Sequence, residues 1–105
     1  MTAVKISACD NELYMIASNA IGPLQATGSS ELIHIKSGFA NPVTDNFVLE
    51  SILPKGTWQI TMIGINWGGA WAFKIAIGSD TYASSGASGE VGVVWHKTTP
   101  AMKIG

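Results

Sequence analysis

Two runs of alternating apolar and polar residues give the clearest structural signal in the chain. Every second residue is apolar or glycine over residues 58–64 and again over residues 71–77. A period of two is typical of a strand with one buried face. Because the short segment 66–69, which contains two glycines, separates the runs, they predict an antiparallel β-hairpin from Gly56 to Gly78.

The alternation also predicts the register of this hairpin, because one register pairs every apolar residue with another and places a glycine beside an aromatic ring. The predicted pairs are Trp58–Ile77, Ile60–Ile75, Met62–Phe73 and Gly64–Trp71. The other face carries Ile63, Ile65, Ala70 and Ala72 towards the tip. A flat, partly apolar second face favours packing against another subunit, so we expect a homo-oligomer with these four residues at its interface.

Shorter alternations and turn-forming residues divide the rest of the chain into further strands and loops. We expect strands near residues 4–8, 13–17, 31–37, 47–53, 81–83 and 91–95. We expect turns or loops over residues 10–12, 19–30, 38–46, 84–89 and 98–105, and an edge strand near Leu24 stays open as an alternative within residues 19–30. No stretch has helical periodicity over three turns. The pattern therefore predicts one all-β domain over residues 1–105, an antiparallel β-sandwich of jelly-roll-like type with about eight short strands.

The composition gives this domain an unusually uncharged surface. Hydrophobic residues make up 47% of the chain and charged residues only 12%, against about 25% in typical soluble proteins. The surface must consist largely of Ser, Thr, Asn and Gly, with some apolar area. Such a surface suits lectin-like binding, self-association or a particle coat.

Charge and targeting signals exclude several classes of function. The net charge is −1 and the chain has six lysines and no arginine, so it lacks the cationic stripe that nucleic-acid binding requires. The uncharged run 56–73 is long enough for a membrane helix, but its period of two argues against a transmembrane segment. The first residues show no secretory signal. We expect cytoplasmic synthesis, and any export would need a leaderless route.

Trp67 is the best candidate for ligand binding, because the predicted hairpin exposes it at its tip. Sugars stack their C–H faces on indole rings, and amide or carboxylate groups such as those of Asn66 and Asp80 bind hydroxyl pairs. Gly68 would let a ring approach closely. The alternative is that Trp67 packs on its own sheet or between subunits. The predicted ligand-binding residues are Asn66, Trp67, Gly68, Gly69, Asp80, Tyr82, Asp45 and Asn46.

Motifs for catalysis or metal binding are weak, so we expect no enzyme activity, no cofactor and no metal. His34 and His96 fall on the polar sides of their strands, without further ligands at metal spacing. Cys9 permits no internal disulfide and is best interpreted as a small buried residue. No Gly-X-Ser-X-Gly motif occurs, and Glu50 and Glu90 stay open as acid–base groups.

Three hypotheses about function follow, in order of preference. The first is a small, non-catalytic carbohydrate-binding module that acts as a homo-oligomer. The second is a structural subunit, such as a jelly-roll fibre-tip or particle-coat protein, in which Trp67 or the pair Ile63 and Ile65 is buried between copies. The third is a membrane-active toxin that inserts the 56–78 hairpin into lipid after oligomerisation.

Overall fold

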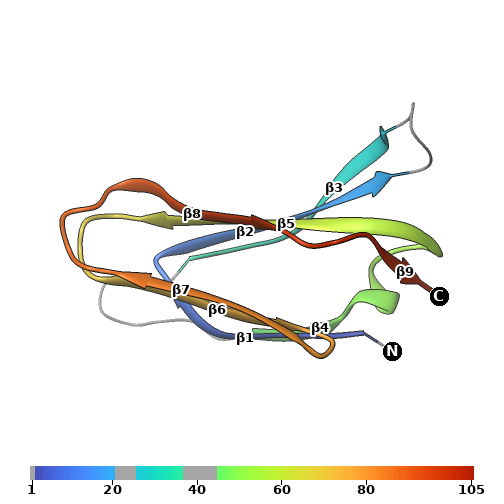
Figure 1. Ribbon diagram of the computed structural model, residues 1–105, viewed down its shortest axis with the longest axis horizontal. Coiled ribbons are helices and arrows are strands. Elements are labelled where there is room, and N and C mark those ends of the chain that lie inside the picture. The colour runs from blue at the N-terminus through green and yellow to red at the C-terminus, as the bar shows by residue number, and fades with distance from the viewer. Residues whose placement is uncertain (1, 21–25, 37–44) are drawn as a thin grey trace.

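The computed structural model describes residues 2–20, 26–36 and 45–105, with the backbone alone for residues 20 and 26–33. Two antiparallel sheets pack face to face (Figure 1). The four-stranded sheet has the order β4 (Asp45–Val48), β1 (Ala3–Asp10), β6 (Trp71–Ile77), β7 (Asp80–Gly86). The five-stranded sheet has the order β3 (Ala26–Lys36), β2 (Glu12–Ala20), β5 (Gly56–Asn66), β8 (Gly92–Thr98), and β9 (Met102–Ile104) also pairs with β5. The predicted all-β sandwich is confirmed.

Two chain segments, β1–β2 and β5–β6, run antiparallel to each other through both sheets and bend together at the point where they pass from one sheet to the other. β1 pairs with β6 in the four-stranded sheet, and β2 pairs with β5 in the five-stranded sheet. Where the chain passes from one sheet to the other, the single residue Asn11 joins β1 to β2, and the longer segment 67–70 joins β5 to β6. The Asn11 backbone N–H donates to the Ile65 carbonyl oxygen at 3.1 Å. We call this corner, Asn11 with residues 67–70, the bend; both chain termini lie at the opposite end of the molecule (Figure 1).

The predicted hairpin from Gly56 to Gly78 is wrong, because β5 and β6 belong to opposite sheets. Gly64 does lie against an aromatic ring, but it is Phe73 across the core and not Trp71 beside it: a Cβ atom at Gly64 would lie 2.6 Å from Phe73 Cε2. Alternation shows which residues are buried. It does not show whether the partner run lies next to the strand or across the core.

The loss of this hairpin removes two further expectations. Ile63 and Ile65 lie on the outer face of the five-stranded sheet, whereas Ala72 lies on the outer face of the four-stranded sheet and Ala70 is exposed in the bend. These four residues therefore do not form one interface. The toxin hypothesis loses the hairpin that would insert, and no helix in the part of the chain described is long and apolar enough to cross a membrane.

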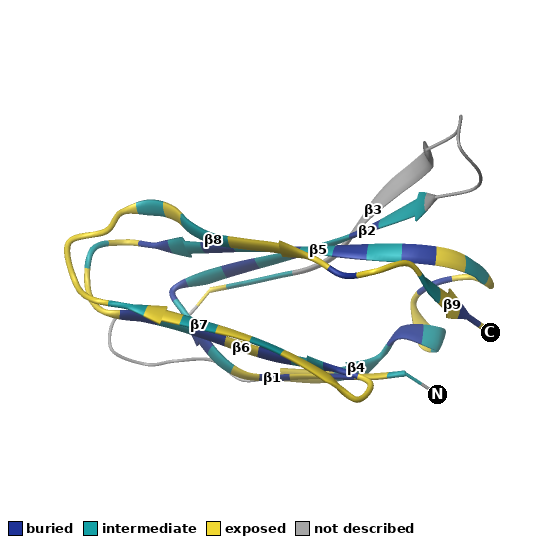
Figure 2. Cartoon of the chain, viewed as in Figure 1, coloured by how far each residue is buried: buried dark blue, intermediate teal, exposed yellow. Residues whose placement is uncertain are grey.

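The hydrophobic core lies between the inner faces of the two sheets, and burial alternates along β5 and β6 (Figure 2). The alternate residues that the two runs predict to face the core are all buried. Cys9 is also buried, which confirms its interpretation, and Trp95 is half-buried against the core. The core side chains from the two runs are Trp58, Ile60, Met62, Trp71, Phe73, Ile75 and Ile77.

Several predicted loops are strands in the structure, mostly at sheet edges. Residues 26–30 belong to β3, residues 84–86 to β7 and residues 102–104 to β9, while Asp45 and Asn46 begin β4. These strands lack a clear alternation of apolar residues, because an edge strand exposes many of its side chains and can carry polar residues there. The predicted strand 47–53 ends early, as the 3₁₀ helix η1 (Leu49–Ser51) follows β4. Other parts of the predicted loops, residues 21–25 and 37–44, lie outside the described residues.

Candidate functional site

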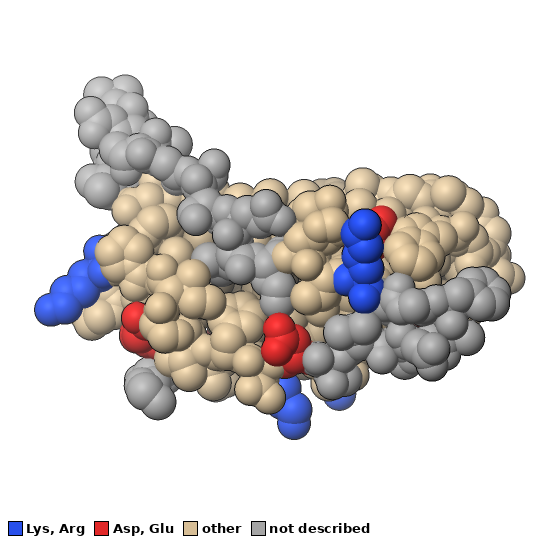
Figure 3. Space-filling model, turned by 180° about the vertical axis from the view of Figure 1, so that it is seen from behind, with Lys and Arg blue, Asp and Glu red and all other residues tan. Residues whose placement is uncertain are grey.

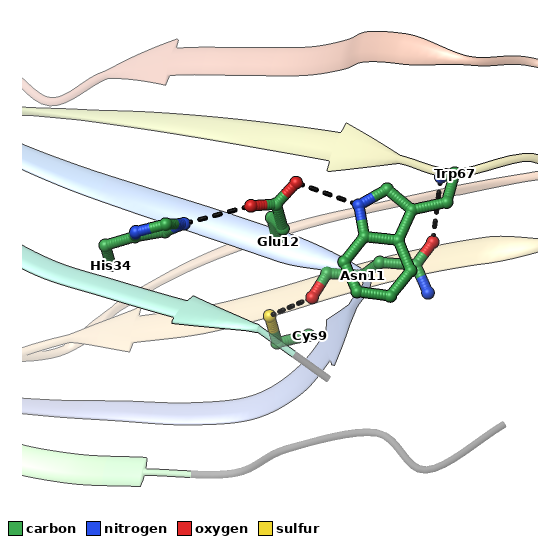
Figure 4. A network of polar contacts seen from close by, with 5 residues as sticks. All are labelled: Cys9, Asn11, Glu12, His34 and Trp67. Atoms are coloured by element: carbon green, nitrogen blue, oxygen red, sulfur yellow. Dashed lines mark hydrogen bonds and ion pairs between the residues drawn. The ribbon is translucent and has the colours of Figure 1, made fainter. Parts of the chain in front are cut away.

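Trp67 lies at the bend with its side chain 45% exposed, and two hydrogen bonds hold it there (Figure 4). Its backbone N–H donates to Asn11 Oδ1 at 2.9 Å, and its indole Nε1–H donates to Glu12 Oε2 at 2.8 Å. Asn11 is buried. The indole is therefore fixed at one edge while part of its surface remains open to solvent.

Glu12 links this indole to two stacked rings, those of His34 and Tyr14. Its other carboxylate oxygen, Oε1, lies 3.0 Å from His34 Nε2, and the imidazole stacks on Tyr14 with ring centroids 3.9 Å apart and planes 9° apart. The hydrogen bond from Trp67 and then that from His34 lower the pKa of Glu12 below its ordinary value. The carboxylate consequently stays ionised at neutral pH. We call Trp67, Glu12, His34 and Tyr14 the Trp67 platform.

The register of the five-stranded sheet places three platform residues, His34, Tyr14 and Glu12, in two rows of outward-facing side chains. One row crosses the four strands as His34, Tyr14, Ile63 and His96. The next row, towards the bend, contains Lys36, Glu12, Ile65 and Val93. The alternate residues of β2, such as Leu13 and Met15, are fully buried. The outer face therefore combines aromatic, imidazole, carboxylate and aliphatic groups.

Asn66, predicted as a ligand-binding residue, has a structural role instead. Its side chain is buried, and Nδ2 donates to the carbonyl oxygens of Gly69 at 2.7 Å and Glu90 at 2.5 Å. Gly68 has φ 138°, a conformation that favours glycine, and its carbonyl accepts from the Gly89 N–H at 2.9 Å. These contacts join residues 66–69 to the β7–β8 connection and so hold the backbone on both sides of Trp67 in place.

The other predicted ligand residues lie away from Trp67, so the single predicted site is divided over three places. The short β6–β7 turn puts Asp80 beside Ile77, at the far end of β6 from the bend, and seven strand residues span about 20 Å. Tyr82 is two residues further along β7. Asp45 and Asn46 are exposed on β4, at the opposite edge of the same sheet. The prediction failed because it treated all nearby turns as neighbours of one hairpin tip.

Asp80 and Tyr82 instead line an open groove where the edge strands β7 and β8 face each other across the sandwich. Two hollows of about 620 Å³ and 410 Å³ share Thr81, Tyr82 and Lys97. We call these residues, with Asp80 and Trp95, the edge groove. Burial, and then the negative charge of Asp80, raise the pKa of the Tyr82 phenol, so this group stays protonated.

Sequence reasoning missed Asn11 and Glu12 as partners of Trp67, and it missed the carboxylate of Glu12 and the ring of Tyr14 as partners of His34. Strand parity does place Glu12 and Tyr14 on one face, since they alternate with buried Leu13. The pairing of β2 with β5, which brings that face to Trp67, could not be predicted while residues 56–78 were taken as a hairpin.

The thiol of Cys9, the one cysteine of the chain, is buried and unreactive in this structure. Its Sγ lies 3.6 Å from the Asn11 carbonyl oxygen, and burial, followed by the charges of Asp10 and Glu12, raises the pKa of the thiol to about 12. A protonated, buried thiol does not attack substrates at neutral pH. Within the described residues, no group of three or more His, Cys, Asp or Glu side chains could hold a metal ion.

Comparison of the chain with protein-family models, with curated proteins and with solved structures finds no match.

Proposed function

We propose that this protein is a non-catalytic, lectin-like carbohydrate-binding module that acts as a homo-oligomer, and that sugars stack on Trp67. One observation carries the proposal: an indole that is 45% exposed is held in place by hydrogen bonds to Asn11 and Glu12. A ring that is fixed before the ligand arrives loses less conformational entropy on binding. Trp67 therefore has the properties of a preorganised stacking surface.

The polar groups beside Trp67 suit the hydroxyls of a sugar. The ionised Glu12 carboxylate has acceptor capacity beyond its bonds to Trp67 and His34, because two carboxylate oxygens offer about four lone-pair sites. Ile65, which pairs with Glu12 on the neighbouring strand, adds apolar surface beside this carboxylate. An exposed aromatic ring with a neighbouring hydrogen-bond acceptor can bind the C–H face and a hydroxyl of the same sugar.

The homo-oligomeric part of the proposal rests on the uncharged, partly apolar surface. On the face that Figure 3 shows, acidic and basic side chains are few and scattered among uncharged residues. Val91 and Val93, 70% and 61% exposed, lie beside the end of β5 that leads into Trp67. Several weak sites presented together raise the overall affinity for a multivalent glycan, and contact between copies would cover these valines.

Replacing Trp67 with alanine tests the sugar site. We expect Trp67→Ala to lose roughly tenfold or more in affinity for whichever glycan the wild-type protein binds on a broad array. Ile52→Ala is the matched control, since Ile52 is 46% exposed and stands outside the platform. Thermal unfolding of both variants checks the fold. Glycan binding that survives in folded Trp67→Ala would exclude this site.

A structural or assembly subunit is the second candidate function, and the exposed Val91 and Val93 favour it. In that case Trp67 is buried between copies and binds no ligand. A silent glycan array combined with a Tm that rises strongly with protein concentration would favour assembly over sugar binding.

A further inference from the structure

The edge groove has the size and lining of a small-ligand site that is separate from the Trp67 platform. Its two hollows, about 620 Å³ and 410 Å³, share Thr81, Tyr82 and Lys97. Ligand pockets commonly have volumes of about 300 to 1,000 Å³. The larger hollow adds further polar groups, among them Gln59 of β5, Asp80 of β7 and Thr98 of β8.

Lys97 is an exposed residue of the edge strand β8, and its register places it on the groove side of the sheet. It pairs with Met62, which is fully buried, so its backbone register points it towards the interior of the sandwich. Tyr82 pairs with the fully buried Ile75 and has the same inward register on β7. Because both strands lie at sheet edges, Lys97 and Tyr82 face the same opening. The lysine stem can lie along apolar surface while the ammonium reaches the mouth of the groove.

The charged groups of the groove do not neutralise each other. Neither Lys97 nor Asp80 takes part in an ion pair within the described part of the chain. The groove therefore offers a cation and an anion to a ligand at the same time. A lysine ammonium binds carboxylates as a point charge, and a carboxylate such as that of Asp80 accepts hydrogen bonds from hydroxyls.

Two aromatic rings complete the lining. Tyr82 and Trp95 are both half-buried and both line the smaller hollow, so part of each ring is covered and part is accessible. The Trp95 ring stacks on the buried ring of Phe73, with ring centroids 5.8 Å apart and planes 13° apart. The accessible parts of two aromatic rings suit the apolar face of a pyranose.

The geometry points to the edge groove as a second binding site, selective for sugars that carry a carboxylate. Lys97 pairs with the sugar carboxylate, Asp80 accepts from its hydroxyls, and Tyr82 with Trp95 contacts its ring face. This site is independent of the proposed stacking on Trp67, because β6 separates Asp80 from the bend by about 20 Å.

An inward-pointing lysine at a sheet edge also has a simpler explanation, since such charges discourage unwanted pairing between edges. The two explanations differ in what they expect of a ligand. Edge protection needs any charge near position 97 and no selectivity. A carboxylate site needs the lysine to discriminate between an acidic sugar and its neutral counterpart.

Titration with methyl β-D-glucuronide and methyl β-D-glucoside, followed by NMR chemical shifts, tests the site. We expect the glucuronide to bind about tenfold more tightly, with shifts confined to residues 80–83 and 95–100. Lys97→Gln should lose this tenfold preference and leave glucoside binding unchanged. Lys103→Gln, an exposed lysine on β9 outside the groove, is the matched control and should change neither affinity.

Trp67→Ala separates this proposal from the stacking site, because it should leave glucuronide binding intact. The proposal is overturned if neither sugar shifts the groove residues, or if both bind equally well. It is also overturned if Lys97→Gln and Lys103→Gln weaken binding equally, which would indicate general surface charge. Loss of glucuronide binding in Trp67→Ala would place the ligand at the platform instead.

Discussion

At the scale of single residues, Glu12 joins the two halves of the Trp67 platform. Its carboxylate accepts from the Trp67 indole with one oxygen and contacts His34 with the other. A protonated carboxyl accepts hydrogen bonds more weakly than a carboxylate, so the contacts of Glu12 with Trp67 and His34 weaken when this group becomes neutral. The position of the exposed indole thus depends in part on one residue that carries no motif of its own.

This charge makes the platform sensitive to acid. The folded-state pKa of Glu12 is depressed below its ordinary value of 4.5, so its stabilising contribution is fully present above pH 4.5 and is lost as pH falls through the lowered pKa. We expect the Tm difference between wild type and Glu12→Gln to be largest near neutral pH and to shrink below pH 4.5. Because Glu50 also has a lowered pKa, the difference between the two proteins, measured by calorimetry across pH, isolates Glu12. A difference that is constant down to the lowest pH would contradict this role.

At the scale of elements, the facing of β5 and β6 across the core makes Gly64 a packing requirement. A Cβ at this position would lie 2.6 Å from the Phe73 ring, which is itself buried, and a real contact that close forces the ring to move. We expect Gly64→Ala to lower the free energy of unfolding by about 1–3 kcal/mol, measured by urea denaturation. Gly69→Ala is the control, because its Cβ would meet nothing within 4 Å, and it should change stability by less than about 0.5 kcal/mol.

The same pair of strands shows how far the sequence could predict this molecule. Alternation correctly marked Trp58, Phe73 and their neighbours as core and so predicted the all-β class. The partner of each strand depends on contacts distant in sequence, such as Glu12 with Ile65, and a local pattern contains no information about them. The candidate site was likewise predictable only as far as local sequence reaches. Trp67 was found by its own chemistry, while Asn11, Glu12 and His34 reach it only through the pairing of β2 with β5 and β3.

At the scale of the whole molecule, the edge strand β8 near the bend is the surface through which we propose that copies associate. The outer edge of β8 has no partner strand among the described residues, and Val91 and Val93 are mostly exposed there. Exposed valines on an unpaired edge are a recognised site of association between chains. Low overall charge removes the repulsion that would otherwise keep copies apart.

The double variant Val91→Ser, Val93→Ser tests this surface. Burying a valine side chain contributes about 1.5 kcal/mol, so each substitution should weaken association roughly tenfold and lower the mass that light scattering records at a given concentration. Ile52→Ser, at an exposed apolar residue elsewhere on the surface, should leave that mass unchanged. If association holds sugar sites together, the double variant should also bind a multivalent glycan surface more weakly while its affinity for a monovalent sugar stays the same. An unchanged mass would move the contact away from β8, and a monomeric wild type would leave single, independent sites on each chain.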